Sequence, residues 1–201
     1  SAESIQLIAD IKTTIPEYCR VNRIIRDIPS THVVEGNKRT SLRQDVHIEL
    51  KKRGQVCKCI RCREVKTSQV DADDLSIRDL IYHPSLAEEH FISFNTSDDK
   101  LAGYLRLSLP DASAPKLDMP DLEGAALIRE VHVYGQSLAL GAERSGAAQH
   151  IGLGTQLLLE AEKIARSKGF TKMAVIAAIG TRLYYENRGF KRGKFYMTRD
   201  I

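Results

Sequence analysis

Gln149-His150-Ile151-Gly152-Leu153-Gly154 is the stretch of sequence that decides the fold of this chain. Its two glycines let the main chain approach a ligand closely, and the first turn of a following helix offers unpaired N–H groups and the positive end of the helix dipole. Such a turn can bind a diphosphate. The three-glycine spacing of a Rossmann site is not met, because residue 157 is Leu.

The turn lies between a predicted strand and a predicted helix. Ala125–Tyr134 reads as a long strand leading to the turn, and residues 153–168 have apolar side chains at helical spacing before Gly169. Further along, the pattern predicts a buried strand at Met173–Ala177, a short helix at Thr181–Asn187 and a closing strand at Gly193–Thr198.

The segment before the turn consists mainly of strands. Three short apolar runs are separated by turn-like residues, and the proline-rich segment 110–121 is a loop. The predicted strands are Leu75–Tyr82, His90–Asn95 and Leu101–Ser108, with a hairpin loop at residues 96–99. We therefore expect an α/β fold with a mixed sheet.

The first third of the chain has a different pattern. Residues 4–14 predict a helix ended by Pro16, Arg20–Arg26 alternates like a strand, and Leu42–Arg53 predicts a helix ended by Gly54. This order is typical of the last piece of an α/β barrel. A piece of this size cannot close a barrel, so we expect the chain to belong to a larger protein. Its two domains would be residues 1–66 and 67–201.

Composition narrows the class of protein. The chain has 201 residues, of which 42% are hydrophobic, which is enough for one full core. It has no apolar run of the length that a membrane helix needs and does not begin like a signal peptide, so we expect a cytoplasmic protein. Residues 1–66 hold 14 Lys/Arg against 8 Asp/Glu. This excess suggests a polyanion partner, although a solvated basic face is the alternative.

Three of the four cysteines lie in Cys57-Lys58-Cys59-Ile60-Arg61-Cys62. Three thiolates in a tight loop suit a structural tetrahedral Zn²⁺ site that needs one more ligand. His32 and His47 are the candidates, and His32 is favoured because it follows a turn, whereas His47 is in the middle of a helix. An iron–sulfur cluster and three free thiols are the alternatives.

The order of the elements around the turn resembles the core of the GNAT acetyltransferases. Two sequence segments make the resemblance more specific, namely Arg129-Glu130-Val131-His132-Val133-Tyr134-Gly135 and Gly180-Thr181-Arg182-Leu183-Tyr184-Tyr185-Glu186-Asn187-Arg188-Gly189-Phe190. Both are similar to the acetyltransferase domain of the Elongator catalytic-subunit family. Arg26-Asp27-Ile28-Pro29, Leu42-Arg43-Gln44 and Arg63-Glu64-Val65 resemble the end of that family's radical S-adenosylmethionine domain. The cysteine cluster is closer to the bacterial and archaeal forms.

The resemblance implies a binding site for acetyl-CoA. A strand edge would pair with pantetheine, backbone N–H groups would bind the pyrophosphate, and a tyrosine would donate a proton to the leaving thiolate or orient the thioester. The residues of the strand edge would be Glu130, Val131, His132 and Val133, and the N–H donors would be Leu153, Gly154 and Thr155. Gln149 and Gly152 would shape the turn, and Tyr185 would be the tyrosine near the thiol.

Some of these roles have open alternatives. Glu130 is a candidate general base, but it could equally be a structural carboxylate paired with Arg129 or a nearby lysine. Tyr184 and Tyr185 are adjacent on a helix and face different ways, so one of them packs in the core. A histidine in a strand, such as His132, is more often a packing or pairing residue than a catalytic one.

The resemblance also implies a reaction. The family uses acetyl-CoA and radical chemistry at S-adenosylmethionine to carboxymethylate a wobble uridine of tRNA. The tRNA would be held by the basic segment 38–66, which contains Lys38, Arg39, Arg43, Lys51, Lys52, Arg53, Lys58, Arg61, Arg63 and Lys66. The cysteine spacing for the radical enzyme's iron–sulfur cluster does not occur in this sequence. We therefore expect the chain to bind acetyl-CoA without modifying tRNA by itself.

Two other functions are compatible with the same sequence. A free-standing lysine acetyltransferase would use the same fold on protein substrates. A zinc-stapled RNA-binding module would keep the fold without turnover. The oligomeric state is open, and a homodimer is compatible with the sequence.

Overall fold

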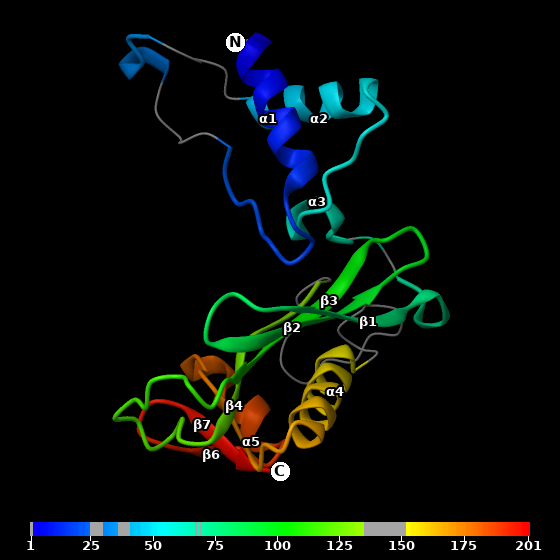
Figure 1. Ribbon diagram of the computed structural model, residues 1–201. Coiled ribbons are helices and arrows are strands. Elements are labelled where there is room, and N and C mark those ends of the chain that lie inside the picture. Colours follow the sequence, from blue (N-terminus) through cyan, green and yellow to red (C-terminus); the bar gives the residue numbers. More distant parts are fainter. Residues whose placement is uncertain (1, 25–29, 36–40, 67, 69, 135–151) are drawn as a thin grey trace. The chain divides into compact units, whose positions relative to one another are not determined.

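The computed structural model describes residues 2–24, 30–35, 41–66, 68, 70–134 and 152–201 (Figure 1). The chain divides into two compact units, Ser1–Glu64 and Val65–Ile201. Gln149 lies outside the described residues. In the described part of the chain, no helix has both the length and the apolar character needed to cross a membrane.

The first unit consists of helices around a small apolar core. Its elements are α1 (Ala2–Thr14), the 3-10 turn η1 (Ser30–His32), α2 (Leu42–Lys52) and α3 (Ile60–Arg63). The helices α1 and α2 pack against each other. One apolar side of each helix is buried because both have hydrophobic residues three or four positions apart. The core contains Ala9, Leu42, Val46, Leu50, Cys57 and Cys59.

The predicted helices of this unit are confirmed, but the strand expected at Arg20–Arg26 is wrong over its described part, residues 20–24, which has no strand. Its backbone acceptors bond to a side chain instead. Arg43 Nη2 donates to the carbonyls of Val21 and Asn22, both at 3.0 Å. A strand needs a neighbouring strand to pair its polar groups, and here a guanidinium from α2 takes that place.

The second unit is built on a seven-stranded mixed sheet in the order β1-β2-β3-β4-β5-β7-β6. The predicted α/β class is confirmed. A short 3-10 turn, η2 (Ala72–Asp74), precedes the sheet. The strands are β1 (Ser76–Tyr82), β2 (Ala87–Asn95), β3 (Leu101–Pro110), β4 (Ala125–Val133), β5 (Lys172–Val175), β6 (Lys191–Arg192) and β7 (Met197–Asp200).

Helix α4 (Leu153–Ser167) packs against β2, β3 and β4, as Figure 1 shows. Its buried residues recur with helical spacing and include Leu153, Leu157, Leu158, Ala161 and Ala165. The helix ends before Gly169, whose φ of +86° is in the left-handed region, as the sequence predicts. The 3-10 turn η4 (Ile179–Thr181) and helix α5 (Arg182–Glu186) follow β5.

The end of the chain differs from the prediction. In place of one strand at Gly193–Thr198, β6 and β7 form a hairpin joined by a turn, in which Gly193 N–H donates to the carbonyl of Tyr196 at 2.8 Å. Asp121 fixes this turn from the distant loop before β4. Its Oδ2 accepts the N–H groups of Phe195 at 2.8 Å and Tyr196 at 3.1 Å. These backbone hydrogen bonds lower the pKa of Asp121.

A buried histidine links β1 and β2. His90 has a 2% exposed side chain and lies between Asp79 Oδ2, 2.7 Å from Nδ1, and Glu88 Oε1, 2.9 Å from Nε2. Burial alone lowers the pKa of His90, but hydrogen bonds to the two carboxylates outweigh it and raise the pKa. Hydrogen bonds from Lys168 and His90 lower the pKa of Glu88 to about 2.

These shifts predict how stability depends on pH. A raised pKa in the folded state means that the His90 contribution is complete below about pH 6.5 and is lost as the pH rises through the raised pKa. We expect wild type to exceed His90→Gln in free energy of unfolding by on the order of 1 kcal/mol at low pH, and by less at high pH. Urea unfolding over a pH series measures this difference.

The control is His83→Gln. His83 lies 3.4 Å from the same Glu88, but its side chain is 65% exposed. An exposed pair contributes little, so this variant should remain close to wild type at every pH. A difference between wild type and His90→Gln that stays constant from about pH 6 to about pH 9 contradicts the assignment.

Candidate functional site

The parallel pairing between β4 and β5 ends before β4 does. The two strands pair from Ala125 opposite Lys172 to Ile128 opposite Val175, whereas β4 continues to Val133 with β3 as its partner. Among the described residues, no strand pairs with Arg129–Val133 on the side of β5. This edge of β4 can therefore pair with an extended ligand as an added strand.

The first turn of α4 begins at a glycine in the left-handed conformation. Gly152 is the N-cap residue and has φ +69° and ψ +22°. Its carbonyl accepts the N–H groups of Thr155 at 2.9 Å and Gln156 at 3.1 Å. Leu153 and Gly154 precede these donors in the same turn, where an N–H group has no acceptor within the helix. The turn therefore provides the kind of anion site that the sequence predicts.

Gly154 is the point where β4, α4 and α5 come together. A Cβ atom built on Gly154 would lie 2.6 Å from Oη of Tyr184 and 3.7 Å from Cγ2 of Val133. The first distance is shorter than any ordinary contact, so only glycine fits without movement of the tyrosine. The close approach places the free edge of β4 beside the first turn of α4.

Arg188 joins α4 to α5. Its Nη2 and Nε donate to Oγ1 of Thr155 at 2.7 and 3.2 Å, and its Nη1 donates to the carbonyl of Tyr184 at 2.8 Å. The guanidinium carbon also lies 3.6 Å from the ring centroid of Tyr184. Arg188 therefore holds the first turn of α4 against the helix that contains the two tyrosines.

Glu130 is held by two donors on β3. Tyr104 Oη donates to Oε1 at 2.5 Å and Arg106 Nε to Oε2 at 3.0 Å. Burial and the hydrogen bond to Glu130 raise the pKa of Tyr104 far above its ordinary value, so the phenol stays protonated and keeps donating. The arginine partner is thus Arg106, directly opposite in the sheet, rather than Arg129.

Arg129 has a different partner, because the pairing of β4 with β3 is irregular at this residue. Arg106 pairs with Glu130 while Leu107 pairs with Ile128, so Arg129 is an extra residue in the ladder. Its Nη1 lies 3.1 Å from Oε1 of the buried Glu89. His132 is exposed on the same strand, with its ring 5.9 Å from that of Tyr104 and stacked on it.

The two adjacent tyrosines have different surroundings. Tyr185 is 7% exposed and its ring packs edge-on against Phe190, with the centroids 5.6 Å apart. Burial raises the pKa of Tyr185 to about 12. Tyr184 is half-buried, and its hydroxyl meets Gly154 in the first turn of α4.

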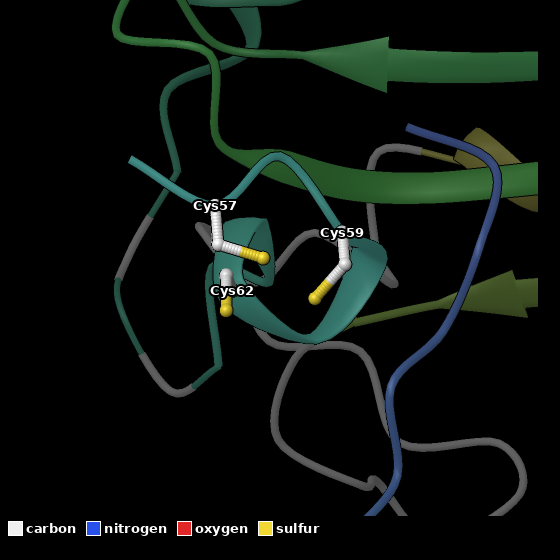
Figure 2. A group of neighbouring side chains, drawn as sticks. All are labelled: Cys57, Cys59 and Cys62. Atoms are coloured by element: carbon white, nitrogen blue, oxygen red, sulfur yellow. The ribbon is translucent and has the colours of Figure 1, made fainter. Parts of the chain in front are cut away.

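The first unit contains a separate cluster of sulfur ligands. The Sγ atoms of Cys57, Cys59 and Cys62 all lie within 4.8 Å of one another. Cys57 and Cys59 precede α3 and Cys62 lies within it, as Figure 2 shows. Hydrogen bonds with Cys57 and Cys62 lower the pKa of the Cys59 thiol, whereas hydrogen bonds with Cys57 and Cys59 raise that of Cys62. Three cysteine sulfur atoms this close together could hold a metal ion once the thiols are deprotonated.

Two nitrogen atoms lie close to Cys62. His47 Nε2 on α2 is 3.8 Å from its Sγ, and Lys12 Nζ on α1 is 3.6 Å from it. Lys12 is only 1% exposed, so its positive charge is buried beside the sulfur atoms. His32, the histidine favoured from the sequence, is exposed in η1.

The structure thus brings several of the predicted site residues of the second unit together. Val133, Gly152, Gly154 and Thr155 lie around the first turn of α4, and Gly154 also meets α5. Sequence reasoning missed two participants at this turn, Tyr184 Oη and Arg188. Arg188 follows α5 in the turn at residues 187–189, so no local pattern shows that it lies beside Tyr184 against the first turn of α4.

Comparison with known proteins identifies the class. A model of the acetyltransferase (GNAT) family matches residues 62–190, and the chain belongs to this family. The predicted GNAT fold is thereby confirmed. The GNAT fold implies that acetyl-CoA is the substrate.

More similar relatives extend the resemblance over nearly the whole chain. A tRNA uridine(34) acetyltransferase from Dehalococcoides mccartyi is 41% identical over 199 residues, which cover 97% of this chain and 43% of the relative. Elongator complex protein 3 of Drosophila melanogaster is 34% identical, with 98% of this chain and 36% of the relative covered. The predicted resemblance to the Elongator catalytic subunit is confirmed.

A solved structure agrees with this result. The structure of the archaeal Elp3 of Methanocaldococcus infernus, with an N-terminal deletion, has a TM-score of 0.85 and 35% identity to this chain. The match covers 98% of this chain and 48% of that one. The chain spans less than half the length of each of these three relatives.

The contact at Gly154 gives a direct test of the site. We expect Gly154→Ala to weaken acetyl-CoA binding about tenfold, because the new methyl group displaces Tyr184 and the turn with it. Calorimetric titration measures the affinity. Gly180→Ala is the matched control, since a Cβ there meets nothing within 4 Å. Equal affinities of the two variants would refute the role given to the Gly154 contact.

Proposed function

We propose that this chain is the acetyl-CoA-binding acetyltransferase part of an enzyme that modifies a wobble uridine of tRNA. The observation that carries the proposal is the edge of β4 beyond Ile128, with which no described strand pairs on the side of β5 and which adjoins the first turn of α4 at Gly154. The pantetheine arm of an acyl-CoA is an extended chain with two amide groups, and a diphosphate joins this arm to the nucleotide. The strand edge suits the amides and the helix turn suits the diphosphate.

The tRNA part of the proposal rests on the relatives. Two of them are named for an acetyltransferase that acts on uridine 34 of tRNA and for a subunit of Elongator. Because this chain spans less than half of each, the acceptor is proposed for the complete enzyme. The partner reaction at S-adenosylmethionine would belong to that enzyme as well.

The thioester chemistry can be assigned to groups in this chain. In hydrolysis, the oxygen of water attacks the acetyl carbon, the carbon–sulfur bond breaks, and the CoA thiolate leaves with the bonding electrons. The water loses a proton to solvent, and solvent returns a proton to the group that protonates the thiolate. Tyr185 is the proposed proton donor to that thiolate, which the resemblance to the acetyltransferases implies and its place on α5 next to Tyr184 supports. Glu130 is proposed to fix the strand, because both of its oxygens already accept hydrogen bonds.

Only part of the basic segment is available to phosphates. Arg43 bonds to backbone carbonyls and Arg53 to Asp10 and Glu49. Arg63 is buried. Lys38 and Arg39 lie outside the described residues. Lys58 forms an ion pair with Glu17 at 3.6 Å. The tRNA contacts are therefore proposed for the exposed Lys51, Lys52, Arg61 and Lys66.

The three sulfur ligands are proposed to hold a structural Zn²⁺. A site with three thiolates and one imidazole is typical of structural zinc. His47 is proposed as the fourth ligand in place of His32, because its Nε2 lies 3.8 Å from Cys62 Sγ. The ion would cross-link α2 to the segment before α3 and so stabilise the small first unit.

Acetyl-CoA binding and use can be tested on the chain itself. We expect calorimetry to detect binding of a non-hydrolysable acetyl-CoA analogue, and tRNA to stimulate release of CoA from acetyl-CoA. Histone peptides and lysine-rich proteins serve as the alternative acceptors. No binding at millimolar analogue would refute the proposal, and acetylation of the peptides without any effect of tRNA would favour a lysine acetyltransferase.

The zinc site predicts a loss of metal and of stability together. We expect Cys59→Ser to abolish metal binding and to lower the unfolding temperature of the first unit, because a metal bound only by the folded state stabilises it. Elemental analysis and thermal unfolding measure the two effects. Cys19→Ser is the control, since Cys19 lies outside the sulfur cluster.

The two histidines provide a second comparison. His47→Gln should reduce zinc affinity strongly and His32→Gln should leave it unchanged. The reverse result would restore His32 as the fourth ligand.

A further inference from the structure

Arg188 occupies an unusual position for a cation. Its three guanidinium nitrogens all donate, two of them to Thr155 Oγ1 and the third to the Tyr184 carbonyl. Its planar face lies on the Tyr184 ring at 3.6 Å from the centroid. The side chain is thus fixed in orientation by contacts on its edge and on its face.

These contacts are all with neutral groups. A hydroxyl, a carbonyl and an aromatic ring hold the guanidinium, and in the described part of the chain no carboxylate forms an ion pair with it. Its charge is therefore not neutralised by these contacts. Arg199, by contrast, pairs with Glu162 nearby. A guanidinium without a carboxylate partner suits an anionic ligand.

The location of this charge agrees with the anion turn. Thr155 is the third residue of α4, and its N–H donates to Gly152 at 2.9 Å. The positive end of the helix dipole and the Arg188 charge therefore act at the same turn. Burial is partial, so solvent does not fully screen the guanidinium.

We propose that Arg188 is a positioning residue for the diphosphate of acetyl-CoA. It fixes Thr155 and Tyr184 around the first turn of α4 and supplies positive charge there. The inference rests on the proposed function, since it assumes that an acyl-CoA binds at this turn. It goes further by naming the residue that makes the site favour ligands with a diphosphate.

The test compares three ligands that differ in their phosphates. Acetyl-CoA has the diphosphate and a 3′-phosphate, 3′-dephospho-acetyl-CoA keeps only the diphosphate, and S-acetylpantetheine has neither. We expect Arg188→Met to bind the first two ligands about tenfold more weakly than wild type, with the same factor for both. Its affinity for S-acetylpantetheine should equal that of wild type. Calorimetry measures the first two affinities and an NMR titration the third.

Two further variants separate charge from geometry. Arg188→Lys keeps the charge but loses the fork and the ring contact, so it should restore part of the affinity. Thr155→Val removes the acceptor while Arg188 remains, and should produce a smaller loss for the same two ligands. Both variants keep the inference testable if Arg188→Met folds poorly. Lys191→Met, an exposed cation on β6, is the control and should match wild type.

The outcomes distinguish this inference from the proposed function. Wild type and Lys191→Met that both fail to bind acetyl-CoA would overturn the proposed function. If wild type binds, an equal loss for all three ligands would show a general structural role and overturn the inference. A loss of affinity for acetyl-CoA alone would show that Arg188 acts on the 3′-phosphate. Unchanged affinities for all three ligands would show that Arg188 does not contribute to binding. Either result also overturns the inference.

Discussion

Parallel pairing between β4 and β5 stops at Ile128 and Val175, although β4 continues to Val133. Backbone N–H and C=O groups at a strand edge need partners, and a ligand that supplies them binds as an added strand. The same end of β4 touches the first turn of α4 through Val133 and Gly154. One break in the sheet therefore places the strand edge proposed to bind amides next to the helix turn proposed to bind an anion.

The site also depends on close contact between two helices. Gly154 on α4 leaves room for the Tyr184 hydroxyl, and Arg188 holds α5 to Thr155. Tyr185 lies on α5 beside these residues, with its ring against Phe190. The proposed diphosphate site and the proposed proton donor are thus linked through the same contact between α4 and α5. A change in the α4–α5 contact should affect both.

Much of this arrangement could be predicted from local sequence patterns. The glycine turn, the apolar face of α4 and the strand Ala125–Val133 each have a signal that lies within a few consecutive residues. The resemblance to known acetyltransferases then implied where acetyl-CoA would bind. The Glu130–Arg106 pair could not be predicted, because it depends on the register of β3 and β4 and on an irregularity at Arg129.

The errors have the same origin. The strand expected from Arg20 was wrong because Arg43, about twenty residues away, takes the backbone acceptors. The final strand was wrong because Asp121 holds the turn at Phe195 and Tyr196. The proximity of His47 to Cys62 likewise depends on how α2 packs on the cysteine segment. Long-range contacts decide these features, and no local pattern shows them.

The central claim is that the unpaired edge of β4 binds the ligand. Amide hydrogen exchange tests it most directly. Saturating acetyl-CoA should slow exchange at the amides of Glu130–Val133 that face away from β3 and at Leu153 and Gly154, while Ala125–Ile128, already paired with β5, should change little. Binding of acetyl-CoA without added protection at Glu130–Val133 would contradict the claim.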